Sequence, residues 1–337
     1  MRAAVYHGAN DITMEDVPYP ELPDDGVIIK VHSSGICGSD LHMYTRGGRD
    51  GTIMGHEFSG DVVEIGSKVK NVKEGDRVVA IGGIGCGECY WCRQGQYIKC
   101  SRLTFLGYGI KGAFAEYTAI PNFVIGMYGE KLPDAVSYEE GSTAEPLAVA
   151  LHAVNQVDPK PDDIVVVTGL GIIGLCVVQI LRSRGVKHII ASGRRAKRLE
   201  IARQSGAEVV VDAAKDDVVP VVKEVAGSRM ADVVFEVAGS PELFDKSLQM
   251  VHRGGKINLV GLYMEPVTWN PSSIVGNDIT IIGCGLRWDL PGAVKLQAEK
   301  KVDTKPMITH EFPLEKTKEA FDTQLTSQDA IKVIVKP

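Results

Sequence analysis

The spacing of apolar residues changes near residue 145 and divides the chain into two regions. Before this point, short runs rich in valine and isoleucine, such as VIIKVHSSGIC, FSGDVVEIG and DRVVAIG, are separated by Gly, Asp and Lys turns. This pattern is typical of an all-β barrel or sandwich. After it, DIVVVT is an unbroken apolar run, as in a parallel strand buried on both faces. We therefore expect a β-rich domain followed by a doubly wound α/β sheet.

Strands and helices alternate through the second region to about residue 286. The expected strands after DIVVVT are HIIAS, EVVVD, ADVVFEVA, KINLVGL and DITIIGCG, and the expected helices are LCVVQILRSRG, RLEIARQSG, VVPVVKEVAG and PELFDKSLQMVHRGG. Two more helical segments, GAVKLQAEKK and PLEKTKEAFDTQ, precede a closing strand, IKVIVKP. A terminal strand needs a sheet for its backbone hydrogen bonds. The sequence therefore predicts one domain from residues 1–145 and 287–337, and a second from residues 146–286.

Composition narrows the class of protein. The chain has 337 residues, more than one ordinary core usually holds, with 44% hydrophobic and 24% charged residues, as in soluble globular proteins. No apolar run is long enough to cross a bilayer, and MRAAVYHGAND lacks the apolar core of a signal peptide. The net charge of −6 gives no electrostatic footprint for nucleic acid. We expect a cytoplasmic protein with neither membrane nor nucleic acid as a partner.

Four of the seven cysteines form the strongest motif. Cys86, Cys89, Cys92 and Cys100 are spaced C-x2-C-x2-C-x7-C, which lets one compact loop surround a tetrahedral ion with four thiolates. An iron–sulfur cluster is the alternative, but the bacterial cluster motif closes with three intervening residues and a proline. Because four thiolates leave no open position, the motif indicates structural zinc.

A second group of metal-binding residue types lies in GICGSDLHMYTRGGRDGTIMGHE. Cys37, His56 and Glu57 offer sulfur, nitrogen and oxygen, and three protein ligands with one open position are typical of catalytic zinc. On these residues alone, ordinary packing of a cysteine and a His-Glu pair stays an open alternative.

A glycine turn follows the strand DIVVVT directly. GLGIIG contains Gly169, Gly171, Ile172, Ile173 and Gly174 in G-x-G-x-x-G spacing, and a helix comes next. Strand, glycine turn and helix in this order are the fingerprint of a dinucleotide site, with the pyrophosphate at the helix N-terminus.

The motifs together resemble a known family over nearly the whole chain. GICGSDLH, GHEFSGDVVEIG, the four-cysteine segment, GAFAEY, AEPLAVALHA, the glycine turn and TKPMITHEFPLEKTKEAF occur in the order seen in zinc-dependent medium-chain dehydrogenases/reductases, and are most similar to the sorbitol, 2,3-butanediol and threonine dehydrogenase subgroup. The resemblance implies a GroES-like β-rich catalytic domain, a Rossmann dinucleotide domain, and catalytic and structural Zn²⁺. It also implies a homodimer or homotetramer, which we expect to form near INLVGL and DITIIGCG.

The resemblance also assigns roles to residues. Cys37, His56 and Glu57 match the catalytic zinc ligands, with Glu145 as a second carboxylate and alternative ligand. Ser39 would take the proton from the substrate and pass it through the cofactor ribose to His42, although Ser39 could also cap the helix SDLHMYT and Glu145 the helix that follows it. Arg287 matches an arginine that contacts polyols, although a surface arginine is an alternative reading.

The loop after the second strand of the α/β region bears on the choice of dinucleotide. NAD enzymes place an acidic residue about 20 residues beyond the glycine turn, for the ribose hydroxyls. Here the position is Gly193, followed by Arg194 and Arg195, and guanidinium groups bind phosphate oxygens well. A solvated basic helix start is the alternative. We therefore expect a preference for NADP(H) over NAD(H).

The expected reaction is hydride transfer between a small-molecule alcohol, namely a secondary alcohol, vicinal diol or polyol, and NADP(H), with zinc as the Lewis acid. The segment between Cys37 and His56 is shorter than in polyol dehydrogenases, which leaves the size of the substrate open. Two alternatives remain: a threonine-type dehydrogenase of 3-hydroxy amino acids, and a non-enzymatic nucleotide-binding or sensor protein.

Overall fold

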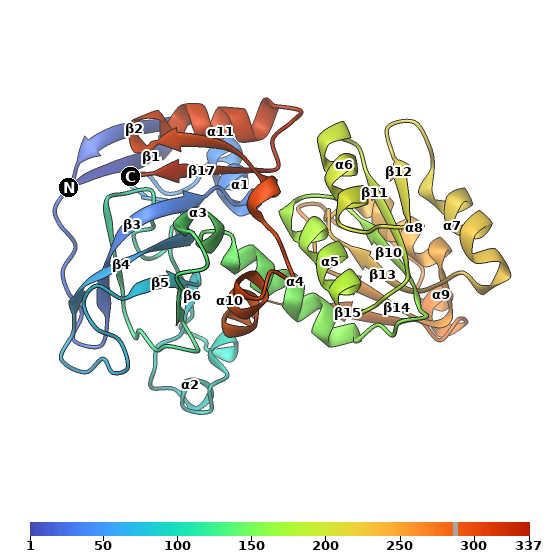
Figure 1. The fold of residues 1–337 in the computed structure, drawn as a ribbon, viewed down its shortest axis with the longest axis horizontal. Coiled ribbons are helices and arrows are strands. Elements are labelled where there is room, and N and C mark those ends of the chain that lie inside the picture. The colour runs from blue at the N-terminus through green and yellow to red at the C-terminus, as the bar shows by residue number, and fades with distance from the viewer. Residues whose placement is uncertain (286–288) are drawn as a thin grey trace. The chain divides into compact units, whose positions relative to one another are not determined.

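The computed structural model describes residues 1–285 and 289–337, which form two compact units (Figure 1). The first unit combines Met1–Ala148 with Thr304–Pro337 and with helix α10 (Leu290–Ala298). The second is formed by the chain from Val149 onward, together with Lys301–Asp303. Each unit contains its own main sheet, and α4 (Ala144–Val157) runs from the first into the second along the chain.

The sheet of the first unit brings the predicted catalytic segments together. Its strand order is β16-β17-β3-β4-β5-β9, with β8 (Tyr117–Ile120) also paired to β3. The strands of this sheet that precede the second unit in the chain are, besides β8, β3 (Val27–Gly35), β4 (Glu57–Ile65), β5 (Arg77–Ala80) and β9 (Gly129–Lys131). β3 and β4 are antiparallel, with Gly35 opposite Glu57. The residues that follow β3 therefore lie beside those that open β4.

The C-terminal segment completes this sheet, as expected from the sequence. β16 (Ile308–Pro313) pairs with β17 (Lys332–Lys336), and β17 pairs antiparallel with β3. Helix α11 (Thr317–Thr326) packs on both C-terminal strands. Its Phe321 lies in a buried cluster with Tyr6, Tyr44 and Phe114. The hairpin of β1 (Arg2–Gly8) and β2 (Asp11–Asp16) contributes to the same core.

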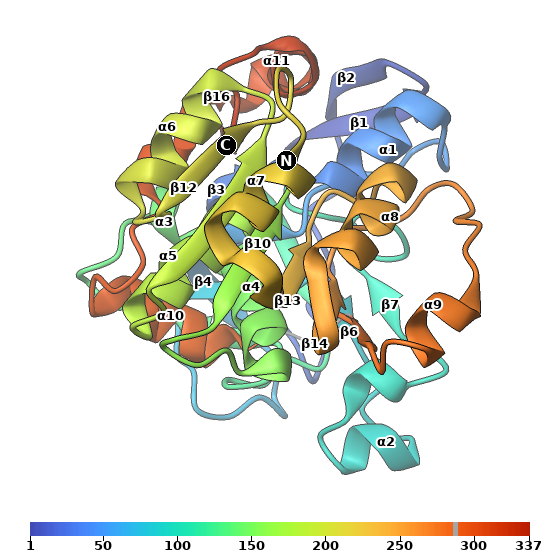
Figure 2. The same ribbon diagram turned by 90° about the vertical axis from the view of Figure 1, so that its right-hand side faces the viewer.

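The second unit is a doubly wound parallel sheet of the order β12-β11-β10-β13-β14-β15, which confirms the predicted Rossmann domain. Its strands are β10 (Ile164–Thr168), β11 (His188–Gly193), β12 (Val209–Asp212), β13 (Ala231–Glu236), β14 (Val251–Leu259) and β15 (Thr280–Gly283). Helices α5 (Ile172–Ser183) and α6 (Ala196–Gln204) pack on β10, β11 and β12. Figure 2 faces the side covered by α7 (Val218–Ala226) and α8 (Pro241–Met250). Burial on both faces explains why β10 begins with four consecutive apolar residues, Ile164 to Val167.

Two local features differ from the pattern in the sequence. β14 begins at Val251, although VHRGG was expected to continue the preceding helix, and its pairing with β13 shifts register after Val251. Glycines in this segment favour such an irregularity over helix. A short helix, α9 (Pro271–Val275), was not predicted. No helix among the described residues is long and apolar enough to span a membrane.

Candidate active site

Cys37, His56 and Glu57 converge at one end of the β3–β4 pair. Cys37 is the N-cap of α1 (Gly38–Arg46), His56 precedes β4, and Glu57 is the first residue of that strand. Their ligand atoms all lie within 4.8 Å of one another. The geometry therefore fits the predicted set of one sulfur, one nitrogen and one oxygen around a zinc ion.

A buried aspartate that the sequence analysis missed orients this group. Asp40 is fully buried and accepts a 3.0 Å hydrogen bond from the backbone N–H of Cys37. Its Oδ1 lies 3.6 Å from Nδ1 of His56. Metal-binding histidines commonly have a carboxylate behind the ring, which fixes the nitrogen that faces the metal. The position of Asp40, three residues after Cys37, was the available signal.

Glu57 also forms a buried ion pair with Lys332, near the C-terminus of the chain. Lys332 on β17 donates to Oε2 of Glu57 and, at 2.8 Å, to the carbonyl of Ile36. The two side chains are only 3% and 2% exposed. Burial alone would lower the pKa of Lys332, but Glu57 and the other acidic groups nearby outweigh it and raise that pKa. The pair therefore occupies Oε2 of Glu57 and leaves Oε1 as the oxygen that a metal could take.

The other predicted residues of this site that the structure describes are Glu145, Ser39 and His42. Glu145 is buried in the first turn of α4 and lies near His56, but it is not in the three-ligand group. Ser39 and His42 are three residues apart on α1 and so share a face. The N-cap is Cys37, so the capping alternative for Ser39 is wrong. Arg287 lies outside the described residues.

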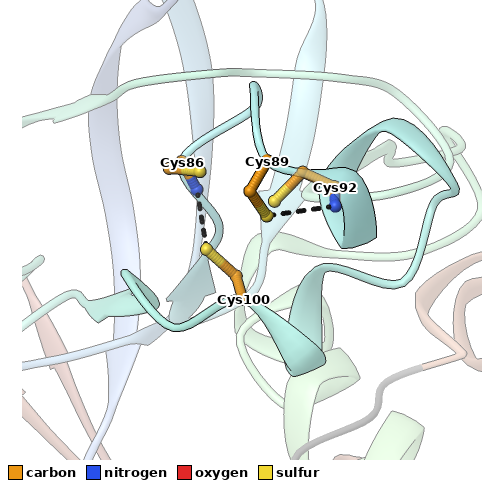
Figure 3. Close-up of side chains that lie close together, drawn as sticks. All are labelled: Cys86, Cys89, Cys92 and Cys100. Carbon is orange, nitrogen blue, oxygen red and sulfur yellow. Dashed lines mark hydrogen bonds between the residues drawn. The ribbon is translucent and has the colours of Figure 1, made fainter.

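The four-cysteine lobe is local, as its spacing predicts (Figure 3). It projects from the paired strands β6 (Gly83–Ile84) and β7 (Thr104–Phe105), and Cys89 is the N-cap of α2 (Tyr90–Arg93). The four sulfurs lie within 4.8 Å of one another, which fits a tetrahedral metal. Backbone N–H groups point at the sulfurs, among them Cys86 N to Cys100 and Cys92 N to Cys89, both at 3.5 Å.

Arg102 supports the same lobe and was not predicted. Its guanidinium donates to Sγ of Cys86 at 3.2 Å and to Glu88 at 2.5 Å. The pKa of Cys86 is lowered to about 6, first by the backbone N–H of Glu88. Donors directed at a sulfur favour the thiolate form that binds metal.

The glycine turn has the shape of a dinucleotide cradle. Gly169 has φ +95°, and a Cβ there would lie 2.8 Å from the backbone N of Ala238. A Cβ on Gly174 would lie 2.0 Å from the carbonyl oxygen of Gly169, so only glycine allows α5 to pack this closely. Gly171, the N-cap of α5, faces open space. A pyrophosphate can therefore approach the backbone at this helix N-terminus, beside Ile172 and Ile173.

The arginines after β11 form a larger group than predicted. Gly193 ends that strand, Arg195 is the N-cap of α6, and Arg198 lies in its first turn. The pKa of Arg198 is lowered to about 10, first by burial and then by repulsion from Arg195 and Arg194. Three guanidinium groups are thus near one another at the carboxyl end of the second strand of the sheet.

Comparison with known proteins identifies the family. The family model for the alcohol dehydrogenase GroES-like domain matches residues 23–127, and that for the zinc-binding dehydrogenase matches residues 173–299. Sorbitol dehydrogenase of Bacillus subtilis is 35% identical, with alignment over 100% of this chain and 97% of the relative. The chain belongs to the zinc-dependent medium-chain dehydrogenase/reductase family. It is an NAD(P)-dependent oxidoreductase.

Two further members of this dehydrogenase family show how close its subgroups are. L-threonine 3-dehydrogenase of Pseudoalteromonas translucida is 31% identical over 96% of each chain. The crystal structure of 2R,3R-butanediol dehydrogenase from Bacillus subtilis covers 100% of this chain and 99% of its own, with 34% identity and a TM-score of 0.89.

The Rossmann domain of this dehydrogenase contains one more buried group that sequence reasoning missed. Glu236, at the carboxyl end of β13, accepts hydrogen bonds from the backbone N–H groups of Ala238 and Gly239 and from the hydroxyl of Tyr263. In a doubly wound sheet, ligands bind at the carboxyl ends of the strands where the order reverses, here between β10 and β13. Glu236 therefore fixes backbone on the side of this crevice opposite the arginines.

Loss of the metal in the four-cysteine lobe should have a different effect from loss of the metal at Cys37. Replacing Cys86 with serine should lower the zinc content from two ions to one per chain, and should lower the melting temperature, because structural zinc contributes to folding. Zinc analysis and thermal unfolding measure both effects, with Cys284→Ser as the control. An unchanged zinc content in Cys86→Ser would contradict a metal in this lobe.

Proposed function

We propose that this dehydrogenase interconverts a secondary alcohol, vicinal diol or polyol and the matching ketone, with NADP(H) as the preferred cofactor. The observation that carries the proposal is the convergence of Cys37, His56 and Glu57 beside Ser39 and His42. When bound, zinc polarises the substrate oxygen and the nicotinamide exchanges a hydride with the carbon. Similarity to sorbitol and 2R,3R-butanediol dehydrogenases supports this substrate class.

The residues of α1 provide the proposed proton path. Ser39 lies two residues after Cys37 and takes the proton of the reacting hydroxyl. His42, on the same face one turn later, receives it and releases it to water. Burial, followed by the charge of Arg46, lowers the pKa of His42, so the imidazole is neutral and able to accept a proton near neutral pH.

A threonine-type reaction is the second candidate, because threonine dehydrogenases are among the similar proteins. Such an enzyme needs a cation for the carboxylate of its substrate. The buried cation beside the candidate zinc ligands, Lys332, already binds Glu57 and the carbonyl of Ile36. This engagement favours an uncharged alcohol.

A panel of alcohols tests the substrate class. Zinc-loaded protein should oxidise 2,3-butanediol, sorbitol or 2-butanol with reduction of the nicotinamide cofactor, measured by its absorbance. Faster turnover of L-threonine than of every alcohol would favour the second candidate. No turnover of any of them would contradict the proposed function.

The preference for NADP(H) is a separate prediction. The three arginines after β11 should bind the 2′-phosphate, and Gly193 presents no carboxylate that would repel it. We expect kcat/KM to be higher with NADP(H), and Arg194→Ala to lower the NADP(H)/NAD(H) ratio by about 10- to 100-fold, as for loss of hydrogen bonds to a charged group. Equal loss with both cofactors, or a clear preference of the parent enzyme for NAD(H), would contradict this prediction.

Substitution of Gly193 with aspartate is a second test of the cofactor preference. Gly193→Asp should lower the ratio of kcat/KM with NADP(H) to that with NAD(H), because the carboxylate repels the 2′-phosphate. However, a Cβ at this position would lie 3.0 Å from Cδ1 of Leu170, so part of any effect would come from crowding. Gly193→Ala is the matched control, since it adds the Cβ without the charge.

We further propose a cytoplasmic homodimer or homotetramer. The first half of INLVGL is in β14, which lies between β13 and β15, so the predicted edge is restricted to β15 in DITIIGCG. Exposed apolar side chains occur in the segment before β15, namely Leu262, Met264, Trp269 and Val275. An open strand edge with apolar neighbours favours pairing with a second copy.

A further inference from the structure

Tyr108 lies in a tight loop that follows β7 in the catalytic unit. Its backbone N–H donates to the carbonyl of Phe105 at 3.1 Å, and Gly107 N donates to the carbonyl of Ile110 at 2.8 Å. Gly107 has φ +81°, a conformation that strongly favours glycine. These bonds give the loop a defined shape and leave Tyr108 partly covered, with 43% of the residue exposed.

The same loop is attached to the backbone that leads directly into His56. Gly112 N donates to the carbonyl of Ile53 at 2.7 Å, and Ala113 N donates to that of Gly55 at 2.9 Å. At its other end, Leu106 N donates to the carbonyl of Gly82 at 2.9 Å. Gly82 itself packs on the His56 side chain, because a Cβ there would lie 2.9 Å from Cβ of His56. The loop is therefore fixed beside a candidate zinc ligand.

The phenol of Tyr108 reaches the start of α1 from this position. It lies close enough to the Ser39 hydroxyl for that hydroxyl to lower its pKa. A phenol is a neutral O–H at physiological pH, and partial burial, together with the nearby Asp40 and Cys37, raises the pKa of Tyr108 further, to about 12. Two protein hydroxyls, each a donor and an acceptor, are thus near one another at the start of α1.

We propose that Tyr108 is a specificity-determining residue, which binds the substrate oxygen on the carbon next to the one that reacts. This inference rests on the proposed function, in which Ser39 receives the proton of the reacting hydroxyl. Vicinal oxygens of a diol lie about as far apart as two hydrogen-bonded oxygens. A substrate whose first oxygen meets Ser39 therefore presents its second oxygen to Tyr108. A simple secondary alcohol has no group for this contact.

The test compares 2,3-butanediol with 2-butanol, which differ by one hydroxyl group. In zinc-loaded Tyr108→Phe, the ratio of kcat/KM for the diol to that for 2-butanol should fall about tenfold, as for the loss of one uncharged hydrogen bond. The change should come mainly from KM of the diol. Tyr90→Phe, which alters an exposed tyrosine of the four-cysteine lobe, is the matched control.

The outcomes separate this inference from the proposed function. A tenfold fall in the ratio, with zinc content and melting temperature unchanged, supports the contact. An unchanged ratio, or equal losses for both alcohols, overturns it, because a role in proton transfer or in folding affects both substrates alike. If the unsubstituted enzyme oxidises neither alcohol, the proposed function fails first.

Discussion

Cys37→Ser should give a folded protein whose kcat/KM for alcohol oxidation is lower by about a thousandfold or more. A zinc ion contributes several kcal/mol to stabilisation of the developing oxygen charge, and 1.4 kcal/mol corresponds to about a factor of ten in rate. Serine provides no thiolate, so the three-ligand group loses its sulfur. The fold should persist, because Cys37 is the N-cap of α1 and serine is a good N-cap residue.

Three measurements define this result. Steady-state kinetics gives the loss of turnover, metal analysis gives the zinc that remains in the four-cysteine lobe, and thermal unfolding shows that the protein is folded. Cys284→Ser makes the same chemical change in the other unit, outside the candidate site. Activity of Cys37→Ser within a few fold of the parent enzyme would rule out Cys37 as a catalytic ligand.

Lys332→Met should destabilise the protein by about 3–5 kcal/mol, as expected when one partner of a buried ion pair is removed. The side chain of Lys332 is 3% exposed and that of Glu57 is 2% exposed, so the carboxylate would stay buried without its cation. Methionine keeps most of the volume of lysine, and the effect therefore reports charge and hydrogen bonding. The free energy of unfolding in urea, at fixed zinc concentration, measures it.

The same strand provides the control. Lys336, also on β17, pairs with Glu139 at 2.5 Å, but its side chain is 42% exposed, and Lys336→Met should cost no more than about 1 kcal/mol. The double variant Lys332→Met with Glu57→Gln should recover part of the stability, because neither charge is then left alone. If Lys332→Met costs no more than Lys336→Met, the pair does not hold Glu57 as inferred.

Local sequence was sufficient for the features whose physics is local. The four sulfurs come from one loop between Cys86 and Cys100, so their spacing alone indicated a shared metal. The glycine turn was equally clear, because Gly169 and Gly174 are needed by a strand–turn–helix unit within a few residues. Unbroken apolar runs identified the parallel strands, since burial on both faces removes alternation. The boundary of β14 was wrong because a bulge does not follow either periodicity.

Contacts between distant segments were decided only by the tertiary structure. Lys332 lies 275 residues from Glu57, and nothing in IKVIVKP distinguishes a buried partner of a zinc ligand from a solvated lysine at a strand end. Tyr108 likewise comes near Ser39 only because its loop is attached to the backbone that leads into His56. The sequence determined which residues could bind metal and dinucleotide. The pairing of β17 with β3, and the loop beside Gly55, determined which side chains orient those residues, because such contacts depend on strand order and burial instead of on spacing along the chain.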